Sequence, residues 1–208
     1  MVIAIDGPAA SGKGTLARRL ARHLGYPHLD TGLLYRAVAR DLMQRSEPLS
    51  DAAAAARAAA SLDTSGLDDP RLRSREMGEA ASLVSAFADV RETLLEFQRR
   101  FSRQEGGAVL DGRDIGTIVC PDADLKLYVT ASPEERARRR QRELSQASEP
   151  AEFDAVLAEI RRRDARDEGR PNAPLRMAED AVLLDTTTLD ADAAFAEALR
   201  MVESRLPA

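Results

Sequence analysis

Residues 2–20 read VIAIDGPAASGKGTLARRL, and they determine the fold of this chain. The apolar start predicts a short buried strand, and the apolar spacing from residue 13 predicts a helix. A glycine-rich turn joins the two, so its backbone N–H groups can surround an anion at the positive end of the helix, while Lys13 can reach the β and γ phosphates of a nucleotide. We therefore predict a phosphate-binding loop formed by Gly7, Pro8, Ala9, Ala10, Ser11, Gly12, Lys13, Gly14 and Thr15.

The rest of the chain alternates short apolar runs with longer helical patterns, which indicates an α/β fold with a mostly parallel sheet. A capping box at Ser132 and Glu135, with Pro133 at the first helical position, marks one helix start. Strands are expected at 2–6, 28–31, 108–111, 125–130 and 182–185. Helices are expected at 13–24, 32–45, 51–61, 74–103 with a break near 87–89, 133–147, 151–168 and 190–205.

Two helical stretches, about 35–104 and about 137–172, interrupt this alternation and are interpreted as insertions. Eight alanines among residues 51–60 predict a surface helix that carries no chemistry. The length of 208 residues suits one domain, so we expect the insertions to belong to a single unit. The remaining core would comprise residues 1–34, 105–136 and 173–208.

The composition excludes several classes of protein. With 44% hydrophobic and 31% charged residues the chain should fold, and no apolar run approaches the length that crosses a membrane. A single cysteine, Cys120, and two histidines cannot form a zinc site by the usual spacings. The first residues lack the pattern of a signal peptide, so we expect a cytoplasmic protein.

Charge and motif then narrow the class of phosphate-loop protein. Residues 134–170, in and just before the second insertion, include ten arginines and ten acidic residues, so nucleic-acid binding, which needs a net basic surface, is not expected. The only asparagine, Asn172, precedes Ala173, which excludes the guanine-reading motif of a GTPase. Gly14 separates Lys13 from Thr15, and this GKGT form is found in nucleoside monophosphate kinases. A small kinase is therefore the leading interpretation.

Charged residues outside the loop are candidates for a substrate site. The DGRD stretch at 111–114 follows a predicted strand, at the edge where parallel sheets bind ligands. Asp30-Thr31-Gly32 is interpreted as a substrate loop, since one copy in an α/β context does not suit an aspartic protease. Arg163, Asp167 and Arg170 share one helix face, which fits either a substrate cluster or a solvated salt-bridge ladder. The same ambiguity applies to Arg136, Arg139 and Arg140.

At this point the chain resembles the bacterial cytidylate kinases, which phosphorylate CMP and dCMP. The resemblance covers nearly the whole chain, and the motifs occur together and in order. They are IDGPAASGKGT at 5–15, LDTGLLYR at 29–36, EAASLVSAFADVRE at 79–92, LDGRDIGT at 110–117, PDADLK at 121–126 and RRRDARDEGRPNAPL at 161–175.

The resemblance implies a P-loop NTPase-type core with a five-stranded parallel sheet flanked by helices, an inserted helical NMP-binding subdomain and a short helical lid. ATP would occupy the phosphate loop, with Mg²⁺ held mainly through its phosphates and water and by no direct protein ligand. CMP or dCMP would lie between the loop and the first insertion, and the protein would act as a monomer without nucleic-acid or membrane partners. The residues implied to bind ATP outside the loop are Arg136 and Arg140.

The resemblance also implies roles for individual residues. The catalytic residues would be Lys13, Arg113 and Arg163. The cytosine edge would be read by Ser82, Arg91 and Asp114. The other residues implied to bind CMP are Thr31, Tyr35, Arg36, Arg113, Arg163, Asp167 and Arg170, of which Arg36, Arg113 and Arg170 would hold its phosphate and Asp167 its ribose.

Two departures from the family pattern concern the acceptor site. Position 31 is Thr where many relatives have Ser, and the segment from 62 to 75 lacks the strand-rich part of longer members. Two alternatives remain open: a small kinase with another acceptor, such as UMP, AMP or a metabolite, and a nucleotide-binding module without transfer activity.

Overall fold

The computed structural model describes residues 1–146 and 148–205. The chain divides into two compact units: a sheet unit, Met1–Leu29 with Ser102–Ala208, and a helical unit, Asp30–Phe101. Ala147, the predicted end of one helix, lies outside the described residues. Within the described part of the chain, no helix combines the length and apolar character that a membrane crossing requires.

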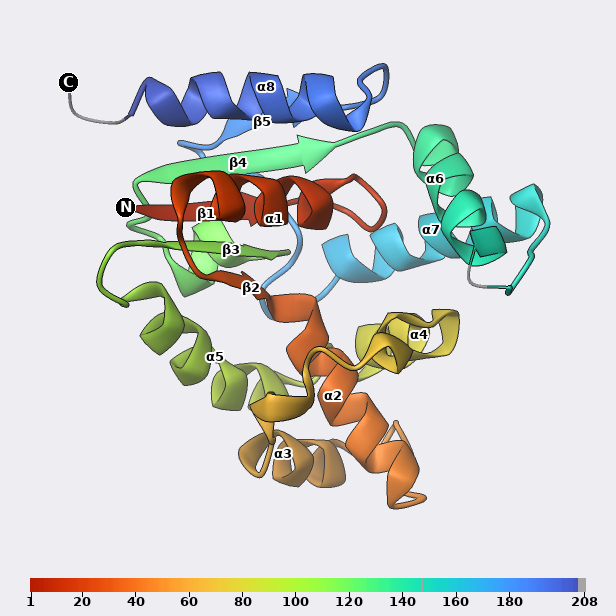
Figure 1. Ribbon diagram of the computed structural model, residues 1–208. Coiled ribbons are helices and arrows are strands. Elements are labelled where there is room, and N and C mark those ends of the chain that lie inside the picture. Colours follow the sequence, from red (N-terminus) through yellow and green to blue (C-terminus); the bar gives the residue numbers. More distant parts are fainter. Residues whose placement is uncertain (147, 206–208) are drawn as a thin grey trace. The chain divides into compact units, whose positions relative to one another are not determined.

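The sheet is five-stranded and parallel, as predicted, with the strand order β2-β3-β1-β4-β5 (Figure 1). The central strand β1 places Asp6 opposite Gly112 of β3 and Tyr128 of β4. Asp6 and Gly112 are the last residues of their strands, and Tyr128 lies two residues before the end of β4. The strand bounds are β1 Val2–Asp6, β2 His28–Asp30, β3 Ala108–Gly112, β4 Leu125–Thr130 and β5 Val182–Asp185.

Helices α1 (Lys13–Leu24) and α8 (Ala191–Glu203) pack on each other and close the main hydrophobic core. Their apolar stripes meet the side chains of β1 and β4 in one cluster, which includes Leu20, Leu127 and Val202. Burial of this stripe is the main reason for a helix to form here, because a helix this short is marginal in water without tertiary packing. The core thereby fixes the end of β1 and the start of α1, between which the phosphate loop lies.

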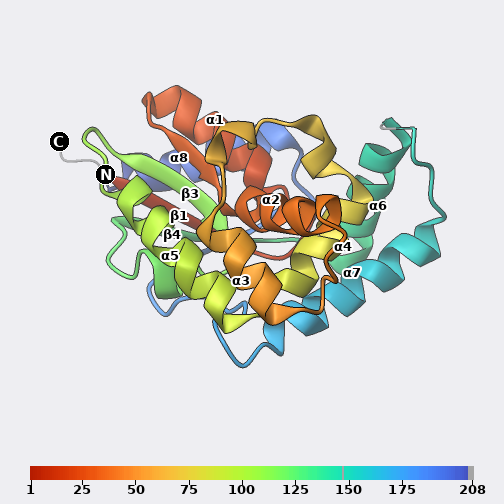
Figure 2. The same cartoon turned by 90° about the horizontal axis from the view of Figure 1, so that it is seen from below.

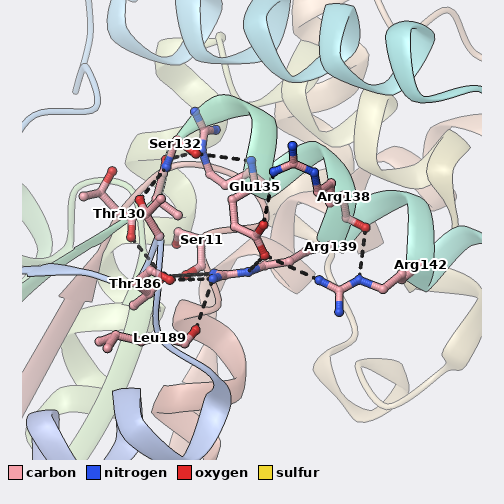
Figure 3. Close-up of polar contacts among 12 residues, drawn as sticks. Ser11, Thr130, Ser132, Glu135, Arg138, Arg139, Arg142, Thr186 and Leu189 are labelled. Atoms are coloured by element: carbon pink, nitrogen blue, oxygen red, sulfur yellow. Dashed lines mark hydrogen bonds and ion pairs between the residues drawn. The ribbon is translucent and has the colours of Figure 1, made fainter.

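Helices α6 (Pro133–Gln146) and α7 (Phe153–Glu168) pack against one another around a second small core. Of the two hydrogen bonds of the predicted capping box at the start of α6, one is present and the other is replaced. Ser132 Oγ accepts the Glu135 N–H at 3.2 Å, but the Ser132 N–H donates to Thr187 Oγ1 at 2.9 Å. The Glu135 carboxylate is drawn to neighbouring arginines instead (Figure 3).

The helical unit contains α2 (Thr31–Gln44), α3 (Ala52–Ala60), α4 (Arg75–Val84) and most of α5 (Ala88–Ser102). Helix α2 packs against both α3 and α4 (Figure 2). The alanine-rich segment forms the predicted helix at the surface, with one face exposed and four alanines of the other face buried. Small side chains allow the close approach of α3 to α2, so the alanines fill a packing role. The buried residues are Ala54, Ala55, Ala58 and Ala59.

Short turns that the sequence did not predict complete the fold. One is a single turn of π-helix, Ile115–Val119, after β3. The carboxylate of Asp6 holds its start, accepting the N–H of Ile115 at 2.8 Å and that of Gly116 at 2.7 Å. Two 3₁₀ turns, Thr64–Gly66 and Pro70–Arg73, occupy the short segment between α3 and α4.

Candidate functional site

The phosphate loop lies between β1 and α1, as the sequence predicts. A Cβ atom at Gly7 would lie 2.0 Å from the carbonyl oxygen of Val129, so only glycine fits there. Gly12 and the non-glycine Ala10 both have positive φ angles, 88° and 58°. Lys13 Nζ donates to the carbonyl of Pro8 at 3.3 Å. The loop is a tight turn with the lysine folded over it, which suits an anion-binding backbone.

A buried cluster of charges lies at the carboxyl edge of the same sheet. Arg113, which follows β3, donates from Nε to Asp167 Oδ2 at 2.8 Å. Arg163 Nε lies 4.0 Å from the same oxygen, and Arg170 Nε donates to the Asp167 carbonyl at 3.3 Å. The Asp167 side chain is only 4% exposed. These contacts exclude the solvated ladder and show a buried cluster of three arginines around one aspartate.

The electrostatics of the cluster follow from this geometry. Burial on its own would raise the pKa of Asp167, but the guanidiniums of Arg113, Arg163 and Arg170 outweigh it and lower the pKa below its usual value. Burial likewise acts to lower the pKa of Arg113, while the neighbouring aspartates, chiefly Asp167, raise it overall. All members are therefore charged at neutral pH, and three cations face one central anion.

Further carboxylates lie beside the loop. Asp111 accepts a hydrogen bond from His28 Nε2 at 2.7 Å, and its other oxygen would lie 3.6 Å from a Cβ at Gly14. Asp114 is buried at the start of the π-helical turn. Burial raises the pKa of Asp6 to about 7, against the lowering effect of its two backbone hydrogen bonds.

The arginines on α6 have different surroundings. Arg136 is buried, makes a two-point contact with Asp164 at 3.0 and 2.7 Å, and donates to the carbonyl of Ala9 at 3.3 Å. Arg140 donates to Glu143 at 3.2 Å. Arg139 donates from Nη1 to the Ser11 carbonyl of the phosphate loop at 3.3 Å. Binding of ATP by Arg136 and Arg140 stays a prediction.

The helical unit holds the other predicted acceptor residues. Tyr35 and Arg91 are both buried, and the Arg91 guanidinium lies 5.4 Å from the centre of the Tyr35 ring. Arg36 donates to the carbonyl of Leu72 at 2.6 Å. Thr31 is buried at the first position of α2, and Ser82 is buried on α4. Their roles toward CMP stay predictions.

Sequence reasoning missed several residues of the sheet unit. Thr186, directly after β5, places its Oγ1 3.0 Å from the Ser11 carbonyl oxygen of the phosphate loop. The signal that selected Asp111, a polar residue after a buried strand, would have found Thr186 as well. Asp164 could not be separated from the other acids of α7, because its partner Arg136 is on another helix.

This arrangement defines the class of protein. A phosphate loop after the central strand of a parallel sheet, with buried arginines at the same edge, is the architecture of a P-loop kinase. The fold is similar to the crystal structure of a shikimate kinase from Bacteroides thetaiotaomicron, with a TM-score of 0.51 and 15% identity, covering 98% of this chain and 97% of the other.

The sequence comparisons define the family. The profile described as "Cytidylate kinase" matches residues 3–204. A cytidylate kinase of Methylobacterium sp. (strain 4-46) is 67% identical over 207 residues, covering 100% of this chain and 99% of the relative. One of Methylocella silvestris is 61% identical over 204 residues, covering 98% and 94%. The chain belongs to the cytidylate kinase family, which confirms the resemblance seen in its motifs.

Proposed function

We propose that this protein transfers the γ-phosphoryl group of ATP to CMP or dCMP, producing ADP and CDP or dCDP. The observation that carries the proposal is the buried cluster of Arg113, Arg163, Arg170 and Asp167, at the same sheet edge as the phosphate loop. Guanidiniums bind phosphate through paired charge-assisted hydrogen bonds, so three of them at this edge suit an anionic phosphate. Membership of the cytidylate kinase family supports CMP as the acceptor.

The reaction needs no general base, because an oxygen of the CMP phosphate is already anionic near neutral pH. Lys13 and the loop N–H groups hold the donor phosphates, while Arg113 and Arg163 stabilise negative charge on the transferred group. The bond from the γ-phosphorus to the bridging oxygen of ADP breaks as the bond to the CMP oxygen forms. Catalysis therefore consists of alignment and electrostatic stabilisation.

Magnesium is proposed to accompany ATP. Among residues 1–146 and 148–205, no group of three His, Cys, Asp or Glu side chains could hold a metal ion. Mg²⁺ commonly keeps water and phosphate oxygens as ligands, so this chain fits an ion held through ATP phosphates and water. When bound, it supplies charge neutralisation at the β and γ phosphates.

Recognition of cytosine is assigned to Asp114, Arg91 and Ser82. The N4 amino group of cytosine donates a hydrogen bond, which a carboxylate such as Asp114 accepts, while N3 and O2 accept from Arg91. Uracil presents a carbonyl where cytosine has the amino group, so an aspartate would face an acceptor. We therefore expect strong preference for CMP and dCMP over UMP.

The remaining acceptor roles follow the family pattern. Thr31 and Tyr35 line the CMP site, Arg36, Arg113 and Arg170 hold the phosphate, and Asp167 accepts from the ribose. Residues 35–104 would form the NMP-binding subdomain and 137–172 the lid. We further propose that the protein works as a monomer in the cytoplasm, where ATP and CMP are available, without a nucleic-acid partner.

An ADP-release assay with CMP, dCMP, UMP, AMP and shikimate tests the proposal. We expect ADP production with CMP and dCMP, and at least 100-fold lower kcat/KM with the others. Asp114→Ala should remove the preference for CMP over UMP. Turnover of UMP, AMP or shikimate as fast as CMP would indicate another small kinase, and absence of acceptor-stimulated ADP with every compound would indicate a binding module.

A further inference from the structure

Arg139 donates a hydrogen bond to a backbone carbonyl of the phosphate loop, and the sequence alone did not distinguish it from Arg136 and Arg140. We propose that Arg139 is a positioning residue for phosphoryl transfer, which acts on the loop backbone through Ser11 and Thr186. The proposal rests on the proposed kinase function. It assigns Arg139 a role that acts through the backbone of the loop.

Hydrogen bonds link the three residues (Figure 3), and these contacts are partly or fully buried. Arg139 Nη1 donates to Thr186 Oγ1 at 2.9 Å and to the Ser11 carbonyl at 3.3 Å. Its Nη2 donates to the Thr186 carbonyl at 2.6 Å. Thr186 Oγ1 lies 3.0 Å from the carbonyl oxygens of both Ser11 and Thr130, and its single hydrogen can be donated to either. The Ser11 carbonyl is thus within hydrogen-bond distance of two side chains, one on α6 and one in the segment after β5.

The arginine has no N–H group left for a nucleotide. A guanidinium has five N–H donors. Besides the three contacts above, Nε donates to Glu135 at 3.2 Å and Nη2 to the Leu189 carbonyl at 3.4 Å. The Arg139 side chain is 19% exposed. Because five protein acceptors match five donors, ATP could accept a hydrogen bond from Arg139 only by displacing one of them.

The orientation of the Ser11 carbonyl determines where the next backbone N–H points. In a trans peptide the C=O and N–H groups point in opposite directions. A Ser11 carbonyl fixed toward Arg139 therefore fixes the Gly12 N–H on the other side, where a phosphate-binding loop presents its amides. The flanking residues Ala10 and Gly12 have φ angles of 58° and 88°, and for the alanine this conformation is unfavourable without support from its surroundings.

The first test compares Arg139→Gln with Arg142→Gln. Arg142 lies on the same helix and also contacts Glu135, but its side chain is 69% exposed and touches no loop residue among the described ones. Misplacement by about 1 Å can cost about 100-fold in rate, so we expect kcat/KM for ATP to fall by about 10- to 100-fold in Arg139→Gln. The KM for CMP should stay within twofold, and Arg142→Gln should match the wild type.

The second test uses Thr186, in case loss of the arginine unfolds the protein. Thr186→Val removes the hydroxyl at constant shape, whereas Thr186→Ser keeps it. We expect Thr186→Val to lower kcat/KM for ATP about tenfold, and Thr186→Ser to stay within threefold of the wild type. The combination of Arg139→Gln with Thr186→Val should lose less than the product of the two single losses, because both act through one carbonyl.

Calorimetric titration with ADP separates failure of this inference from failure of the kinase proposal. If the wild type does not turn over CMP, the proposed function is overturned. If Arg139→Gln and Thr186→Val nevertheless bind ADP more weakly than the wild type, the positioning role is supported. An active wild type with unchanged kcat/KM for ATP in folded Arg139→Gln would overturn the positioning role. Equal activity of Thr186→Val and Thr186→Ser would do the same.

Discussion

Replacing Asp167 by Asn should destabilise the protein and weaken CMP binding together. The substitution keeps the shape of the side chain and one acceptor for Arg113, but it removes the carboxylate charge that lies among the three arginines. Arg113 Nε lies 2.8 Å and Arg163 Nε 4.0 Å from the affected carboxylate. The three arginines, which are partly or fully buried, then lose this carboxylate as a counter-ion.

The size of the effect follows from that burial. Removing one partner of a buried ion pair costs about 3–5 kcal/mol, and the retained amide acceptor favours the lower end, about 3 kcal/mol. For a chain of this length about 1 kcal/mol shifts the Tm by about 2–4 °C, so the Tm should fall by roughly 6–12 °C.

The pH dependence has a definite sign. The pKa of Asp167 lies below its ordinary 3.8, so its contribution is present above that pH and is lost as the pH falls through the folded-state pKa. The difference in Tm between the wild type and Asp167→Asn should therefore shrink in acid.

Differential scanning calorimetry and steady-state kinetics test this prediction, with Asp164→Asn as the matched control. Asp164 lies one turn earlier on α7 and pairs with Arg136. Both variants should lose thermal stability, but only Asp167→Asn should raise the KM for CMP, by about tenfold, about 1.4 kcal/mol. An Asp167→Asn protein with a Tm within 2 °C of the wild type and an unchanged KM for CMP would refute the account of the cluster.

Three further predictions concern the loop, the helical unit and the buried aspartate. Gly7→Ala places a Cβ 2.0 Å from a backbone carbonyl, so ADP binding measured by calorimetry should be lost. Ala58→Leu overpacks a fully buried position on α3 and should cost about 1–3 kcal/mol in urea unfolding. The pKa of Asp6, about 7, exceeds its unfolded value of 3.8, so folding binds a proton between these limits and stability falls as the pH rises through them. Asp6→Asn should remove that slope, as measured by unfolding at pH 4 to 7.

A control variant or a contradicting outcome accompanies each of these three predictions. Gly25→Ala, at the far end of α1, meets no atom within 4 Å; its positive φ of 69° should cost some stability, but ADP binding should be kept. Arg57→Leu, beside Ala58 but 62% exposed, should change stability by less than about 0.5 kcal/mol. A wild type whose stability does not fall between pH 4 and pH 7 any more than that of Asp6→Asn would contradict the assignment to this carboxyl group.

The sequence predicts those parts of the fold that depend on local pattern. The bounds of β1, β4 and β5 are correct at both ends, because each is a short apolar run between polar or turn residues. The π-helical turn at 115–119 was missed because the carboxylate that holds it, Asp6, is more than 100 residues away in the chain. The buried face of the alanine helix was not predicted, because a run of alanines has no polar and apolar alternation from which such a face could be recognised.

In the candidate site, too, residues that are contiguous in the sequence could be predicted, and contacts between distant residues could not. The phosphate loop is contiguous, so its residues could be predicted from one segment. Whether Arg163, Asp167 and Arg170 form a surface ladder or a buried cluster depends on Arg113, which lies 54 residues from Asp167 in the sequence. The distinct role of Arg139 likewise depends on acceptors contributed by the loop and by the segment after β5.

The most direct test of the account follows the transferred group itself. The purified protein is incubated with [γ-³²P]ATP, magnesium and CMP or UMP, and the products are separated by chromatography. We predict that the label appears in CDP at the rate at which ADP forms, and that little label appears in UDP. ATP hydrolysis to labelled inorganic phosphate without labelled CDP, or equal labelling of CDP and UDP, would contradict the central claim.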